Sequence, residues 1–178
     1  LGPTTVQLTF TYNDPVAGEI SSTDTVEAVV GDINPPTVTG VSDPVYLWPP
    51  NHKLHEVNVN LLVEDSCDPD PMVTLISLIS SEPDNGQGDG NTVDDIQEAE
   101  IGTDDRTFLL RAERMGGGTG RIYTATYNAT DATGNSTDGV VEILVPHDQG
   151  DMKAAKAAAK AAQKMAKAAE QAARKADK

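Results

Sequence analysis

The sequence has few of the features that define several large classes of protein. Its 178 residues include a single cysteine, Cys67, so no disulfide can form within the chain and cysteine usage does not indicate a compartment. No apolar run approaches the roughly 20 residues that a membrane-spanning helix requires. The catalytic motifs GxSxG and HExxH and the phosphate-binding loop are missing. We therefore expect neither a membrane span nor an enzyme, and we expect Cys67 to be a small buried residue.

Positive charge is scarce over most of the chain and abundant at one end. Residues 1–150 contain five Lys or Arg against 25 Asp or Glu, whereas residues 151–178 contain eight against three. The acidic part should repel nucleic acid, so we expect no nucleic-acid partner. The chain starts at Leu1 rather than Met, from which we expect a processed mature form.

Three segments differ in residue pattern. Residues 1–35 alternate apolar and polar residues on both sides of a turn at 13–18 and end at a Pro-Pro pair, which predicts a hairpin. Residues 36–148 hold short runs rich in Val, Ile, Leu and Thr, separated by turn residues, which predicts antiparallel strands. The expected strands in this segment are Thr37–Val41, Pro44–Trp48, His55–Val63, Met72–Ile79, Thr107–Arg111, Arg121–Ala129 and Val140–Val145. Polar loops are expected at 81–98, 116–120 and 131–139. This size and strand number match an all-β, immunoglobulin-like antiparallel β-sandwich.

The predicted hairpin has an apolar face that needs a cover. Val6, Leu8, Phe10 and Tyr12 alternate with polar residues and so lie on one face of a strand. An isolated two-stranded hairpin is marginally stable in water. This face is therefore expected either to pack in cis on residues 36–146, or to add in trans to the sheet of a neighbouring subunit.

The last segment, 149–178, predicts a helical tail. It consists mostly of Ala with Lys, Gln, Glu and Arg, which are strong helix formers, and we expect Asp151 to cap its start. Lysines spaced by three or four residues form a stripe that includes Lys153, Lys156, Lys160, Lys164 and Lys167. This stripe is expected to contact the acidic part of a neighbouring copy or an anionic envelope polymer. A solvated helix is the alternative.

Acidic turn residues predict a calcium site, since Ca²⁺ prefers oxygen ligands from Asp, Asn and the backbone. The candidate ligands are Asp65, Asp68, Asp84, Asp89, Asn91 and Asp94. Their spacing does not fit an EF-hand loop, and solvated turn residues are the alternative. His52, His55 and His147 are expected to be ordinary surface or packing residues. Asn128 and Asn135 lie in glycosylation sequons.

Several separated motifs in residues 36–148 occur in a familiar order. They are LWPPNHK at 47–53, DSCDP at 65–69, GDGNT at 88–92, LRAER at 110–114, GRIYT at 120–124 and TDATGNS at 130–136. Together they resemble an immunoglobulin-like repeat module of bacterial and some archaeal surface proteins, over about 110 of the 178 residues. Many members of that family carry a second cysteine near the position that is Ala129 here.

The resemblance implies an extracellular or cell-surface location and a non-catalytic role. Together with the two appended segments, it leads us to expect a structural subunit that self-assembles into a filament, appendage or surface layer by strand donation and tail contacts. The alternative is an adhesive module that binds a surface glycan or protein. Tyr46 and Trp48 are aromatic residues that could stack on a sugar, although a Trp before two prolines is more often a core or corner residue.

Overall fold

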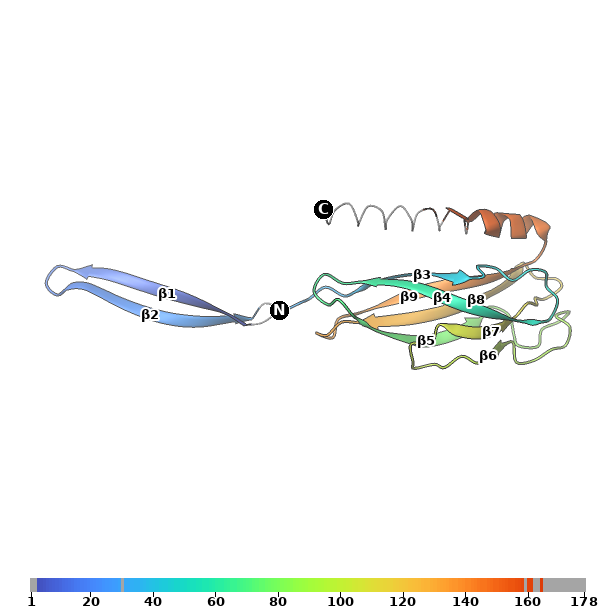
Figure 1. The fold of residues 1–178 in the computed structure, drawn as a ribbon, viewed down its shortest axis with the longest axis horizontal. Coiled ribbons are helices and arrows are strands. Elements are labelled where there is room, and N and C mark those ends of the chain that lie inside the picture. Colours follow the sequence, from blue (N-terminus) through green and yellow to red (C-terminus); the bar gives the residue numbers. More distant parts are fainter. Residues whose placement is uncertain (1–2, 30, 159, 162–163, 165–178) are drawn as a thin grey trace.

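The computed structural model describes residues 3–29, 31–158, 160–161 and 164, and it shows a β-sandwich with an appended hairpin and helix (Figure 1). The strands in these residues are β1 (Pro3–Asp14), β2 (Gly18–Val29), β3 (Thr37–Asp43), β4 (Leu54–Glu64), β5 (Met72–Ser80), β6 (Ile96–Gln97), β7 (Thr107–Arg111), β8 (Gly120–Thr130) and β9 (Ser136–Pro146). Residues 149–158 are helical.

Strands β3 to β9 form two antiparallel sheets around one core. The first sheet has the strand order β3-β4-β7-β6, and the second has the order β5-β8-β9. Buried apolar side chains from both sheets pack together: Leu47, Val57, Val59, Leu75, Phe108, Leu110, Ala112, Tyr123, Ala125, Tyr127, Val141, Ile143 and Val145. The expected all-β sandwich is therefore confirmed.

Strand β8 illustrates how residue alternation builds this core. Every second residue from Arg121 to Ala129 is buried, and the residues between them are partly exposed. Tyr123 and Tyr127 supply most of the apolar volume of this row. Arg121 stands first in the same row, and a charged group at a core position needs polar partners to be stable there.

One side of the sandwich is closed by close contact between β3 and β9. A Cβ atom added to Gly139 of β9 would lie only 2.4 Å from Cγ1 of Val38 in β3, so this approach requires glycine. Just after β3, the N–H of Leu47 donates to the carbonyl oxygen of Leu144 at 2.8 Å. The prediction of a strand at 44–48 is wrong, because this stretch makes only an isolated parallel bridge between Tyr46 and Leu144.

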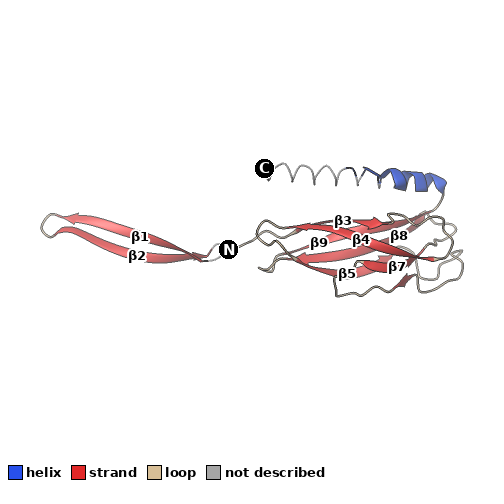
Figure 2. Ribbon diagram, in the orientation of Figure 1, coloured by secondary structure: helices blue, strands red, loops and turns tan. Residues whose placement is uncertain are grey.

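The other strands differ little from the predicted ranges, apart from β9 and β6. Strand β9 begins at Ser136, four residues before the predicted start, because residues 136–139 continue the ladder with β8. Strand β6 has only two residues and lies within the segment 81–98, which was expected to be a loop. The hairpin and the start of the helix leave the sandwich at opposite ends (Figures 1 and 2).

Candidate functional site

Strands β1 and β2 form a ribbon with one apolar and one polar face. Directly paired residues of antiparallel strands lie on the same face. The register pairs Tyr12 with Ile20 and Phe10 with Ser22, and Leu8 continues the row. The opposite face is polar throughout the part whose side chains are described: Gln7, Thr9, Thr11, Asn13, Glu19, Ser21 and Thr23.

The apolar face of the hairpin is open to solvent. The exposed fractions are 45% for Leu8, 69% for Phe10, 62% for Tyr12 and 51% for Ile20. Figure 1 shows the hairpin extending beyond the end of the sandwich. These side chains are therefore not buried in cis on residues 36–146, which was one of the two expected arrangements. The side chain of Val6 lies outside the described part of the chain.

The sandwich has an edge strand with exposed apolar residues of its own. Strand β5 ends the three-stranded sheet, and its Met72, Ile76 and Ile79 are 67%, 43% and 59% exposed. Hydrogen bonds join Leu75 to Gly102 and Thr103, so the middle of this edge is covered. The two ends of β5 remain as the places where another strand could pair, since unpaired strand edges are templates for addition.

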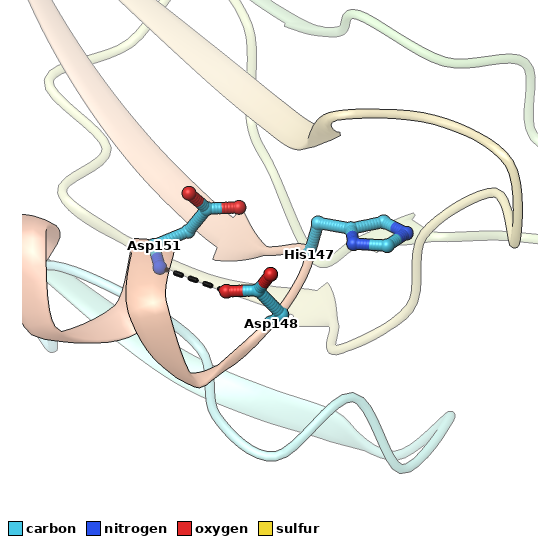
Figure 3. A group of neighbouring side chains, drawn as sticks. All are labelled: His147, Asp148 and Asp151. Carbon is cyan, nitrogen blue, oxygen red and sulfur yellow. Dashed lines mark hydrogen bonds between the residues drawn. The ribbon is translucent and has the colours of Figure 1, made fainter.

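The helix begins directly after β9. Oδ1 of Asp148 accepts a hydrogen bond from the N–H of Gly150 at 2.6 Å. It also accepts one from the N–H of Asp151 at 3.0 Å, which Figure 3 shows. These two bonds lower the pKa of Asp148. The prediction that Asp151 caps the helix is wrong, because the helix starts earlier, at residue 149, and Asp148 supplies the capping oxygen.

His147, Asp148 and Asp151 form a small cluster at this helix start. One potential ligand atom from each lies within 4.8 Å of the others. In Figure 3 the His147 ring points away from the two carboxylates, and its Nε2 lies 3.3 Å from the carbonyl oxygen of Gly116. The cluster is thus explained by helix capping and by a contact to the 116–120 loop.

The lysine stripe is exposed over the part that the structure describes. Lys153, Lys156, Lys160 and Lys164 are helical and exposed, and no ion pair among the described residues includes them. Lys167 lies outside the described residues. The positive charge of this segment is therefore available to an external anionic surface.

A buried cluster of charges surrounds Arg121, which the sequence did not single out. The guanidinium contacts Asp95 and lies 3.3 Å from Oε2 of Glu82. Asp89 and Glu113 are 3.6 and 3.9 Å away, and both are fully buried. Burial and the nearby Glu113 carboxylate raise the pKa of Asp95 to about 6, although the hydrogen bond from Arg121 opposes this shift. The cluster ties the 81–98 segment to the sandwich.

Four of the predicted calcium ligands belong to this segment, and their oxygens have other partners. Oδ1 and Oδ2 of Asp84 accept the N–H groups of Asp95 and Asp94 at 2.8 and 3.0 Å, and these bonds lower the pKa of Asp84. Asp89 accepts the N–H groups of Gly86 and Asn91 and faces Arg121. Asn91 and Asp94 are exposed at positive φ. The structure does not bring these four side chains together as a cation cage.

The other two predicted ligands lie at the hairpin end of the sandwich. Oδ2 of Asp68 accepts the N–H of Ala132 at 2.8 Å. Asp65 instead groups with two carboxylates that were not among the predicted ligands, Asp32 and Asp131. Oδ1 of Asp65 accepts the N–H groups of Cys67 and Asp68, both at 2.8 Å. Of the six predicted ligands, only Asp65 therefore belongs to a carboxylate cluster in the described residues.

Cys67 is exposed, so the prediction that it is buried is wrong, because it sits in the turn after β4. The side-chain amide of Asn128 donates to Asp138 at 2.7 Å. That of Asn135 donates to Oδ2 of Asp131 at 2.8 Å. Tyr46 and Trp48 are half-buried beside the closed side of the sandwich.

Comparisons with protein-family models, with curated proteins and with solved structures found no match. None of the helical residues that the structure describes forms a segment of the length and hydrophobicity that a membrane span needs.

Proposed function

We propose that this chain is an extracellular or cell-surface structural subunit that joins other copies of itself through its hairpin and its basic tail. The observation that carries the proposal is the solvent-exposed apolar face of Leu8, Phe10, Tyr12 and Ile20. Full burial of an exposed Leu or Phe side chain contributes about 1.5–3 kcal/mol, and Leu8 and Phe10, which are 45% and 69% exposed, would gain part of this. A second copy can supply that burial by accepting the ribbon beside a free strand edge.

We further propose that residues 36–148 form an immunoglobulin-like module. The strand orders β3-β4-β7-β6 and β5-β8-β9 correspond to the ABED and CFG sheets of a seven-stranded constant-type domain. Modules of this architecture serve many functions, so the architecture supports a role only together with the appended segments. The resemblance of the motifs between residues 47 and 136 to bacterial surface modules adds support for the proposed location.

The charge distribution favours the tail as a second contact. Residues 1–150 carry 25 acidic residues, and the described lysines of the helix are exposed without ion-pair partners among the described residues. A tail from one copy can therefore lie on the acidic surface of the next. An anionic envelope polymer would offer the same charge complementarity.

The proposal is tested by replacing two residues on each face of β1. We expect the full chain to form multimers in size-exclusion chromatography with light scattering and ordered polymers in negative-stain microscopy. Leu8→Ser with Phe10→Ser should shift it to a monomer, because the buried apolar area is lost. The matched control is Thr9→Ser with Thr11→Ser on the polar face, which should assemble like the parent.

A parent chain that stays monomeric at high concentration would contradict the proposal. Equal loss of assembly in both double variants would show that the apolar face is not the contact. Circular dichroism checks that both variants keep the folded sandwich. If the monomeric Ser variant instead binds a glycan on an array as well as the parent does, the adhesive alternative is favoured.

A further inference from the structure

Three carboxylates from distant parts of the chain meet where the hairpin joins the sandwich. Asp32 lies in the linker between β2 and β3, Asp65 follows β4, and Asp131 follows β8. One carboxylate oxygen from each lies within 4.8 Å of the others. The grouping is thus made by the fold and not by neighbours in the sequence.

One oxygen of this cluster has no partner of its own. Oδ1 of Asp32 accepts the N–H of Asn34 at 3.0 Å. Its Oδ2 is shielded from solvent and makes no hydrogen bond with any described residue. A buried carboxylate oxygen left in this way is unfavourable, whereas a bound cation would satisfy it.

Within the described residues, the carboxylates of this cluster also have no basic side chain as a partner. None of the ion pairs between described residues includes Asp32, Asp65 or Asp131. Asp131 is only 6% exposed. Its Oδ1 accepts the N–H groups of Thr133 and Asn135, both at 2.8 Å, and its Oδ2 accepts the side-chain amide of Asn135 at 2.8 Å, so its partners are neutral donors.

We propose that Asp32, Asp65 and Asp131 bind one calcium ion at the junction of the hairpin and the sandwich. All three side chains offer hard oxygen ligands, and no histidine or cysteine belongs to the cluster, which disfavours zinc and copper. Calcium accepts six to eight oxygens in flexible geometry, so backbone carbonyls and water can complete the shell.

The ion ties the linker to the end of the sandwich. The carbonyl oxygen of Asp32 already accepts hydrogen bonds from Asn135 at 3.1 Å and from Thr133 at 3.4 Å. A cation shared with Asp65 and Asp131 adds bonds that hold the linker against the loops after both β4 and β8. Calcium therefore restrains the direction in which the hairpin leaves the sandwich.

The test is calorimetric titration of Ca²⁺ into the full chain after treatment with a chelator. We expect one ion per chain, with affinity reduced about tenfold or more in Asp32→Asn and in Asp65→Asn. Asparagine keeps the acceptor oxygen that each residue uses for local backbone N–H groups and removes only the charge. Calcium should also protect the 31–36 linker from limited proteolysis in the parent and not in these variants.

The matched control is Asp14→Asn. Asp14 accepts the N–H groups of Val16 and Ala17, both at 2.8 Å, in the same type of turn that Asp65 forms, but it lies at the hairpin tip. This variant should bind calcium like the parent. No binding at millimolar Ca²⁺, or unchanged affinity in either Asp32→Asn or Asp65→Asn, overturns the proposal.

A second variant separates this site from the cluster at the helix start. Asp151→Asn should leave calcium affinity unchanged, and a loss there would assign the ion to His147, Asp148 and Asp151 instead. The site does not depend on self-assembly. Repeating the titration on the Leu8→Ser with Phe10→Ser chain, with its oligomeric state measured separately, distinguishes failure of the metal site from failure of assembly.

Discussion

At the scale of single residues, Arg121 is the side chain around which the carboxylates of the acidic loop 81–98 gather. Its guanidinium is fully buried and contacts carboxylates that come from the loop before β6 and from the segment after β7. Removal of one partner from a buried charge cluster leaves the others uncompensated, which costs more than the intact pair contributes. Arg121 of β8 therefore helps to hold the 81–98 segment, together with Arg111 of β7, which pairs with Asp95 at 3.0 Å.

Replacement of Arg121 by Leu should strongly destabilise the protein. We expect the free energy of unfolding to fall by about 3–5 kcal/mol, because the buried Asp89 would lose its cation and Asp95 would keep only Arg111. Urea denaturation followed by circular dichroism measures this loss. The control is Arg106→Leu, which removes a partly exposed ion pair with Asp104 and should cost less than about 1 kcal/mol. Equal losses in the two variants would refute the role given to Arg121.

The raised pKa of Asp95 predicts how stability depends on pH. The folded state holds this proton up to about pH 6, whereas the ordinary value is 3.8. Asp95 therefore contributes stability that is complete below about pH 4 and is lost as the pH rises through 6. The free energy of unfolding of the parent minus that of Asp95→Asn should therefore fall as the pH rises from about 4 to about 6. Urea midpoints at several pH values measure it, and a difference that does not change with pH would contradict the assignment.

At the scale of elements, the contact between β3 and β9 depends on the absence of a side chain at Gly139. Gly139→Ala should lower the free energy of unfolding by about 1–3 kcal/mol, because the new methyl group would overlap Val38. Gly117→Ala is the control, since a Cβ there would meet nothing within 4 Å. Thermal unfolding compares the two variants. A Gly139→Ala protein as stable as the control would show that β3 shifts without cost.

Most strands could be predicted because apolar and polar residues alternate along them, as in β4 and β8. The prediction failed for the stretch 44–48 and for the helix cap, where the neighbouring strand β9 decides the structure. The stretch 44–48 has strand-like residues, but it makes a single bridge to β9 instead of a ladder. The cap of the helix was misplaced by three residues, because Asp148 and Asp151 are both suitable capping residues and only the end of β9 selects between them.

At the scale of the whole molecule, the limits of sequence-based prediction are clearest for the acidic residues. Neighbouring acids in the 84–94 segment suggested one site, yet they bind backbone N–H groups and Arg121. Asp32, Asp65 and Asp131 come together across about one hundred residues of chain. No spacing rule connects them, since the two loops and the linker meet only after both sheets have formed. The apolar face of the hairpin, in contrast, followed directly from period-two alternation, whereas its exposure to solvent did not.

The length of the hairpin has a further consequence for any polymer of this chain. Its strands have 12 residues each, which corresponds to about 40 Å at about 3.4 Å per residue. In the proposed polymer, the length of this ribbon would set the axial repeat between successive copies. Because a slip of one residue would present the Thr-rich face instead, the repeat can change only in steps of two residues, or about 7 Å.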